Sequence, residues 1–387
     1  MNSRERVLAA VNHQEPDKIP FDLGGMAQSG IHREVYLQLR KCLGLPEREA
    51  QVLNINTQQA RLDEDVRERL LIDTYLVYSV WASVESSIVK QEGGYLVYTD
   101  EWNVKRRMPK KQGYYFDIAS HPLSGDDVIE RFKGYAWPDP TEPARFEGLR
   151  EEAEIAGAAG KFVVLMGLCP GIVEMYSWLR GFNDFYLDLG AEPKIAEMFL
   201  DKLACLKIAY WRRALKEFGE FIDAVNEADD IAGQRGLLIS PKTYRTVIKP
   251  YHRRLFEAIK ESAPHVKLIF HSCGAIRTLI PDFIEIGADV LNPVQTSAAG
   301  MDPVDLKKTF GKEICFWGGG VDAQNVLSTG SEGDIRDNVR YNIEALAPGG
   351  GFVFAPTHII QPQVPPQNIM VMWETLQRYG DYSVANI

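Results

Sequence analysis

Short apolar runs alternate along the chain with longer segments whose apolar residues recur every three or four positions. Apolar runs of this length predict buried strands, and the three-to-four spacing predicts amphipathic helices. Their alternation indicates βα units built around a parallel sheet. Eight strands are expected, in chain order: Lys18–Leu23, Thr74–Val80, Phe162–Gly167, Phe221–Asn226, Lys267–His271, Val290–Pro293, Ile314–Trp317 and Phe352–Ala355.

Several helices carry clear start or stop signals. Ser240-Pro241 and Asp302-Pro303 each place an N-cap residue before a proline at the first helical position. Pro250 lies inside the first of these helical patterns and is expected to kink it. The last helix should end near Gly380.

Eight strands, each followed by a helical segment, predict a closed (β/α)8 barrel, the TIM barrel. We expect residues 1–387 to form a single domain, with an N-terminal helical extension and a hairpin insertion, Tyr95–Pro109, between strands 2 and 3. A doubly wound open sheet is the alternative, because eight strands alone do not require closure. No Gly-x-Gly-x-x-Gly follows the first strand, so the usual signal of a dinucleotide site is missing.

Composition narrows the classes of partner. The 387 residues include 43 Lys and Arg against 53 Asp and Glu, a net charge of −10, which disfavours duplex nucleic acid and anionic membranes. Five scattered cysteines form no disulfide framework. Because the N-terminus lacks a signal-peptide pattern and no apolar run reaches about 18 residues, we expect a cytoplasmic protein.

The fifth predicted strand ends in a His-x-Cys pair. Residues i and i+2 of a strand point the same way, so His271 and Cys273 can converge just past the strand end. An imidazole and a thiolate suit a divalent metal such as zinc. The alternative is a buried cysteine beside a capping histidine, and a metal site needs at least one further ligand.

Other polar residues follow other strands, where barrel enzymes place their chemistry. His358 comes just after the eighth strand, and Glu227 and Asp230 come just after the fourth. If the barrel closes, these groups ring one mouth with His271 and Cys273. The alternative for the acidic pair is a solvated loop or a helix cap.

Two weaker features also follow strands. Gly318 and Gly319, after the seventh strand, could let a ligand approach the backbone, although such a run is more often only a flexible turn. Asp22, at the end of the first strand, could line the mouth or only form a turn.

The chain resembles, nearly end to end, the uroporphyrinogen decarboxylase superfamily of (β/α)8 barrels. The segments that carry the resemblance are 4–13 with 16–20, 238–244, 271–274 (His-Ser-Cys-Gly) and 365–369. Two branches of that superfamily compete as the closer match.

The decarboxylases proper carry an Arg-Gln-Ala-Gly-Arg type segment after the first strand and an Asp after the second. This chain has Asp22–Gln28 at the first place and Tyr78-Ser79-Val80 at the second. Both departures disfavour decarboxylation, since a substrate with many carboxylates needs fixed cations in its pocket.

The zinc methyltransferases that demethylate methylcobalamin carry His-x-Cys after the fifth strand, as at His271 and Cys273. Their third ligand is a Cys after the eighth strand, where this chain has His358. The resemblance therefore implies a zinc-activated thiol that attacks a cobalt-bound methyl group, with Glu227 and Asp230 as fourth ligands or partners of the ligands.

The resemblance also implies a corrinoid partner. The chain contains no Asp-x-His-x-x-Gly segment, so a separate corrinoid protein must deliver methylcobalamin, or the cofactor binds free in the barrel mouth. The acceptor is a thiol or a tetrahydrofolate-type pterin, and the protein a homodimer or a monomer. The alternatives are uroporphyrinogen decarboxylation and a non-catalytic barrel that binds a corrinoid or a metal.

Overall fold

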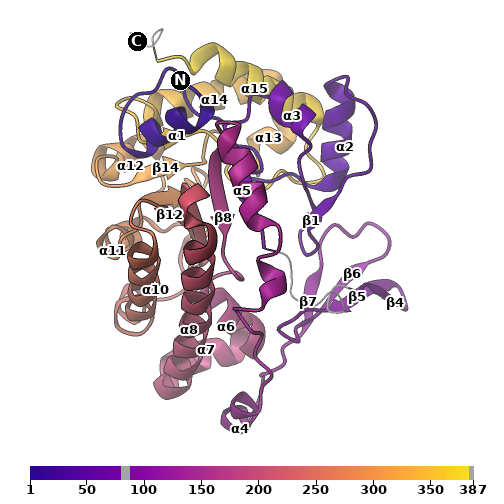
Figure 1. Ribbon diagram of the computed structural model, residues 1–387, viewed down its shortest axis with the longest axis vertical. Helices are drawn as coiled ribbons and strands as arrows, with labels where there is room; N and C mark the ends of the chain where they lie inside the picture. Colours follow the sequence, from indigo (N-terminus) through magenta and orange to yellow (C-terminus); the bar gives the residue numbers. More distant parts are fainter. Residues whose placement is uncertain (80–87, 383–387) are drawn as a thin grey trace.

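The structure is a computed structural model that describes residues 1–79 and 88–382. A parallel sheet forms its centre and curls around an axis (Figure 1). Its strands lie side by side in the order β3 (Thr74–Val77), β8 (Phe162–Met166), β9 (Ala224–Ala228), β12 (Lys267–His271), β13 (Val290–Asn292), β14 (Cys315–Trp317) and β15 (Phe352–Val353).

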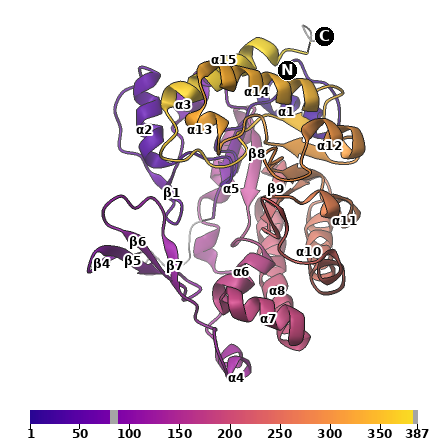
Figure 2. The same cartoon turned by 180° about the vertical axis from the view of Figure 1, so that it is seen from behind.

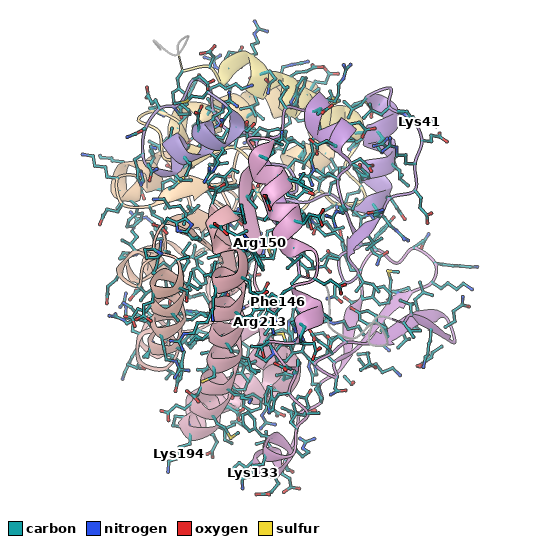
Figure 3. All side chains as sticks on the ribbon, viewed as in Figure 1. Lys41, Lys133, Phe146, Arg150, Lys194 and Arg213 are labelled. Atoms are coloured by element: carbon teal, nitrogen blue, oxygen red, sulfur yellow. The ribbon has the colours of Figure 1, made fainter. Side chains whose placement is uncertain are left out.

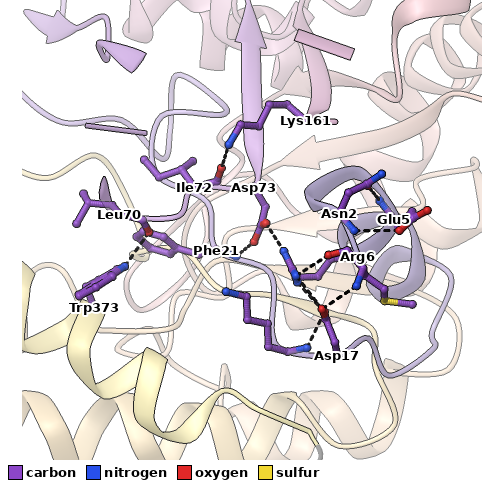
Figure 4. Close-up of polar contacts among 12 residues, drawn as sticks. Asn2, Glu5, Arg6, Asp17, Phe21, Leu70, Ile72, Asp73, Lys161 and Trp373 are labelled. Atoms are coloured by element: carbon purple, nitrogen blue, oxygen red, sulfur yellow. Dashed lines mark hydrogen bonds and ion pairs between the residues drawn. The ribbon is translucent and has the colours of Figure 1, made fainter. Parts of the chain in front are cut away.

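The predicted first strand joins the two edges of this sheet without forming a ladder of its own. Phe21 bridges Phe354 in parallel, and the Asp22 N–H donates to the Phe354 carbonyl at 2.8 Å. At the other edge the Asp73 N–H donates to the Phe21 carbonyl at 2.9 Å. The Asp73 carboxylate accepts from Phe21 N and pairs with Arg6 (Figure 4). This closure confirms the TIM-barrel-like fold over the open sheet.

The barrel interior is apolar and closed at its amino-terminal end. Alternate strand residues face inward, as the period of two requires. Helix α1 (Ser3–Val11) packs Val7, Ala10 and Val11 against this interior cluster. The cluster contains, among others, Phe162, Val164, Ala224, Ile269, Val290, Cys315, Trp317 and Val353. The opposite end, where the strands terminate, is left for polar side chains.

Helices surround the sheet (Figures 1 and 2). They are α2 (Arg33–Cys42), α3 (Glu64–Arg69), α4 (Val128–Lys133), α5 (Leu149–Ala158), α6 (Ile172–Arg180), α7 (Phe182–Ala191), α8 (Pro193–Phe218), α9 (Pro241–Thr243), α10 (Lys249–Ser262), α11 (Ile280–Glu285), α12 (Pro303–Phe310), α13 (Val326–Thr329), α14 (Glu332–Leu346) and α15 (Pro366–Tyr379). Arg213 of α8 stacks on Phe146, 4.7 Å from the ring centre (Figure 3). No helix among the described residues is long and apolar enough to cross a membrane.

The insertion between β3 and β8 is larger than the predicted hairpin. It is a four-stranded antiparallel sheet of β4 (Lys90–Glu92), β5 (Tyr95–Thr99), β6 (Lys105–Pro109) and β7 (Asp117–Ser120). Figures 1 and 2 show it beside the barrel and away from α1. Two short ribbons, β1 (Val52–Asn54) with β2 (Gln59–Ala60) and β10 (Ala232–Gly233) with β11 (Gly236–Leu237), lie in loops.

Some predicted boundaries move. The fourth strand starts at Ala224 because residues 219–221 form a 3₁₀ turn, and it continues to Ala228. Val80, the predicted end of the second strand, lies outside the described residues. Pro250 does not kink a helix interior, because a π-helical turn, Tyr244–Ile248, ends just before α10 and leaves the proline in that helix's first turn.

Candidate metal centre

Three side chains converge where β12 and β15 end. One ligand atom each from His271, Cys273 and His358 lies within 4.8 Å of the other two. His271 Nε2 is 3.2 Å from Cys273 Sγ, and the two imidazole rings are 5.7 Å apart. The structure thus brings together the three residues that the strand ends indicated as metal ligands.

A hydrogen bond from the neighbouring strand sets the tautomer of His271. Its Nδ1 lies 2.6 Å from Asn292 Oδ1, while Asn292 Nδ2 donates to the Trp317 carbonyl at 2.8 Å. Because the Asn292 oxygen faces the ring, Nδ1 carries the proton and Nε2 keeps its lone pair. His271 therefore presents a free Nε2 to Cys273 and His358, which is the arrangement that metal-binding histidines usually have.

Two adjacent carboxylates hold the loop after β9 beside this cluster. Asp230 Oδ1 accepts from the Cys273 N–H at 2.8 Å and lies 3.8 Å from His271 Nε2. Asp229 is buried and bonds His252 Nε2 at 2.7 Å. Asp229 also accepts from the first N–H groups of α6, so the loop is tied to a helix end. Asp230 is thereby fixed within reach of the cluster.

The surroundings disfavour charge on two of the three candidate ligands, Cys273 and His358. Burial, followed by the charges of Asp230 and Glu174, raises the pKa of the Cys273 thiol well above its usual range. Burial and the neighbouring His271 lower the pKa of His358 to about 4. At neutral pH the cluster therefore holds a thiol and an imidazole with an open lone pair. A divalent cation bound at Cys273 would lower the pKa of its thiol and displace its proton.

The donor set fits zinc. Two imidazoles and one thiolate are ligands that zinc takes readily, and three protein ligands are the number found in sites that keep one coordination position open. The Asp230 carboxylate is the nearest further oxygen donor, consistent with a partner that orients the ligands or completes the set.

Glu227 lies apart from this cluster. It belongs to β9 and points outward, pairing with Lys207 at 3.0 Å and accepting from Trp211 Nε1 at 2.5 Å. Burial raises the pKa of Glu227, against the lowering effect of Lys207. The structure therefore places Glu227 between the sheet and α8 rather than at the mouth.

The other residues singled out after strands support the barrel. The buried Asp22 accepts from Thr74 Oγ1 at 2.6 Å and from Trp317 Nε1 at 2.8 Å, inside the barrel. Gly318 and Gly319 have positive φ, and a Cβ on Gly319 would lie 2.5 Å from the Val294 carbonyl oxygen. These glycines let the loop after β14 pack closely on the residues that follow β13.

Two cavities meet at the cluster. One, of about 240 Å³, is lined by His271, His358 and Asp230 and reaches the antiparallel sheet. The other, of about 290 Å³, is lined by Cys273 and also by His358. The cluster therefore borders both cavities.

The first cavity also contains residues that the sequence analysis missed. Arg106 lies on β6, Glu174 in the first turn of α6, and Asn226 inside β9. Asn292, which orients His271, ends β13, and its place at a strand's carboxyl end was a usable signal. Nothing in the local sequence marks Arg106, because the hairpin pattern does not reveal which of its faces meets the barrel.

Comparison with known proteins gives consistent matches. The family model described as Uroporphyrinogen decarboxylase (URO-D) matches residues 103–379. The uroporphyrinogen decarboxylase of Nostoc punctiforme is 25% identical over 196 residues, 51% of each chain. That of Legionella pneumophila strain Lens is 25% identical over 197 residues, 51% of this chain and 52% of the relative. The chain thus matches about half the length of these curated relatives.

Among solved structures, a methyltransferase from Methanosarcina mazei superposes with a TM-score of 0.66. The superposition covers 98% of this chain and 99% of the other, at 18% sequence identity. At that identity the likeness establishes a shared fold.

Proposed function

This chain belongs to the uroporphyrinogen decarboxylase (URO-D) family, and within that family we propose that it is a zinc-dependent methyltransferase. It would move a methyl group between a corrinoid and a thiol or tetrahydrofolate-type acceptor. The observation that carries the proposal is the convergence of His271, Cys273 and His358, with ligand atoms within 4.8 Å, between two cavities. The fold shared with a methyltransferase agrees with it.

Each residue near the cluster has a part in this proposal. His271 would bind through Nε2, held in that tautomer by Asn292, while Cys273 binds as a thiolate and His358 through a ring nitrogen. Asp230 would support the Cys273 backbone and share the positive charge. Zinc, when bound, supplies an open coordination position that lowers the pKa of an acceptor thiol.

Two reactants must meet at such a centre, and the two cavities offer room for them. The acceptor would enter one cavity, and the cobalt-bound methyl group would approach from the other. A separate corrinoid protein would carry the donor, because the chain has no corrinoid-binding motif of its own.

Uroporphyrinogen decarboxylation is the second candidate, favoured by the names of the sequence relatives. The charges in the first cavity oppose it. Among the described residues of its lining, Arg106 is the only lysine or arginine, and it already pairs with Asp100. A substrate with several carboxylates needs several fixed cations, and that lining offers one.

One pair of assays separates these functions. Zinc-loaded protein is incubated with methylcobalamin and a thiol, and the loss of the cobalt–methyl absorbance is followed; a parallel sample receives uroporphyrinogen. We expect demethylation, its loss in Cys273→Ala, and its retention in Cys205→Ala, which removes an exposed thiol on α8. Carboxyl loss from uroporphyrinogen would overturn the proposal, and product in neither assay would favour a binding protein.

A further inference from the structure

Unpaired polar atoms gather in the first cavity. Among the described residues, nine buried side-chain nitrogen or oxygen atoms have no hydrogen-bond partner. Four of them, on Gln28, Thr57, Arg106 and Asn226, belong to residues that line the cavity beside His271 and His358. Buried polar groups are normally paired, so a concentration of unpaired ones in a cavity points to a ligand that pairs them.

Arg106 is the charged member of this set. Its side chain is 4% exposed, its Nε donates to Asp100 Oδ2 at 3.0 Å, and its guanidinium stacks on Trp178 at 4.3 Å. These two contacts hold the guanidinium in place, yet its Nη2 has no partner among the described residues. A guanidinium fixed in this way can bind the planar oxygen pair of a carboxylate with little further loss of entropy.

The rest of the lining limits the charge and shape of the ligand. Asp230 also lines the cavity, and Arg106 is the only lysine or arginine among the described residues of its lining, so a dianion such as phosphate would keep an uncompensated charge that a monoanion avoids. Apolar side chains cover much of the remaining wall, among them Met166, Met175 and Ile359. The cavity is about 240 Å³, which suits a small molecule with an apolar body and one anionic end.

Asn226 adds a second polar requirement. Its Nδ2 donates weakly to the Glu227 carbonyl at 3.4 Å, and its Oδ1 is left without a donor. In the β9–β12 pairing, Asn226 lies opposite Ile269 and Ala228 lies opposite His271. Asn226 is therefore on the same face of the sheet as Ala228, two residues before the level of the candidate metal ligand His271. A hydroxyl or amine hydrogen on the ligand would satisfy Oδ1 close to the centre.

We propose that this cavity binds a small monocarboxylate, with its carboxylate on Arg106 and a hydroxyl or amine group toward Asn226. This inference rests on the proposed function in one respect: it makes that monocarboxylate the methyl donor or acceptor of the same centre. Its class is set by Arg106, a residue of the antiparallel insertion, rather than by the barrel strands.

The test is a binding measurement by titration calorimetry on the zinc-loaded 387-residue chain. The probes are benzoate, its uncharged isostere benzamide, and inorganic phosphate. We expect benzoate to bind at least about tenfold more tightly than benzamide, since a hydrogen bond to a charged group adds that much when water is excluded. Phosphate should bind more weakly than benzoate.

Variants assign the preference to Arg106. Arg106→Gln should bind benzoate and benzamide alike, whereas Arg107→Gln, on the exposed face of the same strand, should behave as the native protein. Because Arg106→Gln leaves the buried Asp100 unpaired, the double variant Asp100→Asn with Arg106→Gln removes both charges and keeps the test valid if the single variant misfolds.

Equal binding or no binding of benzoate and benzamide by the native protein would overturn the proposal, as would a preference for phosphate. Native benzoate affinity in a folded variant lacking Arg106 would also overturn it. Because no methyl transfer is measured, failure of the methyltransferase assay and failure of carboxylate binding are separate results.

Discussion

Two hydrogen positions decide what the residues of the centre can do. The Nδ1 proton of His271 is fixed by Asn292, which frees Nε2. The Cys273 proton is retained, because burial and nearby carboxylates raise the pKa of its thiol. His271 can thus bind a metal without losing a proton, whereas Cys273 must lose its thiol proton to bind one.

Replacing Asn292 tests the first of these. Asn292→Ala leaves the Nδ1–H of His271 without its acceptor, so the ring loses its fixed tautomer and orientation. We expect zinc affinity, measured by competition with a chromogenic chelator, to fall about 10- to 100-fold. Asn368→Ala is the matched control, since Asn368 of α15 donates to the Leu327 carbonyl of α13 and lines neither cavity at the cluster. Equal zinc affinity in both variants would contradict the role given to Asn292.

Proton release on metal binding tests the second. The raised pKa of Cys273 keeps it a thiol at neutral pH, whereas the lowered pKa of His358 leaves its imidazole already neutral. Zinc should therefore displace about one proton from Cys273, and affinity should rise about tenfold per pH unit below the thiol pKa. Calorimetry in buffers of different ionisation enthalpy measures this. A proton count near zero would mean that Cys273 is not a ligand.

At the scale of elements, a shift of a few residues in the bounds of β9 explains why Glu227 does not face the barrel mouth. The strand predicted over residues 221–226 runs from Ala224 to Ala228, so Glu227 lies within it rather than after it. Strand residues alternate between faces, and Asn226 takes the inward position that leaves Glu227 outward, against Lys207. Apolar periodicity could not set this boundary, because Phe221 extends the apolar run although it belongs to a 3₁₀ turn.

The loop after β9 couples helix α6 to the candidate metal centre. Asp229 accepts from the α6 N–H groups of Val173 and Glu174 and from His252. Asp229→Asn removes the charge from these bonds, so we expect the free energy of unfolding to fall by about 2–3 kcal/mol. Zinc affinity should fall too, because Asp230 loses its anchored neighbour.

The control for that prediction is another helix cap. Ser331 caps α14 at the exposed surface, and Ser331→Ala should lower the free energy of unfolding by about 1 kcal/mol without changing zinc affinity. Urea unfolding and chelator competition measure the two quantities. Unchanged zinc affinity in a destabilised Asp229→Asn protein would show that the loop and the centre are independent.

At the scale of the whole molecule, the barrel and the convergence of its strand ends could be predicted, and the insertion could not. The β12 strand, Lys267–His271, has the predicted bounds, because its apolar run is sharply limited by polar residues. Closure places His358 beside His271 across two intervening strands. Arg106, by contrast, reaches the cavity through the fold of an antiparallel sheet whose docking no local pattern encodes.

The closure of the barrel buries His358 beside His271, so the stability of the whole fold in acid depends on this histidine. Burial, then the nearby His271, lowers the pKa of His358 to about 4, whereas an exposed histidine of the unfolded chain titrates near 6.5. Between these values the unfolded chain of the metal-free protein binds the additional proton. The free energy of unfolding should therefore fall as pH drops through this window, by up to about 1.4 kcal/mol per pH unit from this group, and be unaffected by it above pH 6.5.

The contribution is isolated by difference, because carboxylates also titrate as the pH falls. Urea unfolding of metal-free protein is compared at several pH values with that of His358→Gln, which cannot take up the proton. His265→Gln, at an exposed position two residues before β12 begins and so at the other end of the strand from His271, serves as the control and should follow the native protein. The difference in the free energy of unfolding, native protein minus His358→Gln, should shrink as the pH falls toward 4. Parallel curves would show that His358 titrates alike in the folded and unfolded chains, and that burial at the mouth does not hold it neutral for a metal.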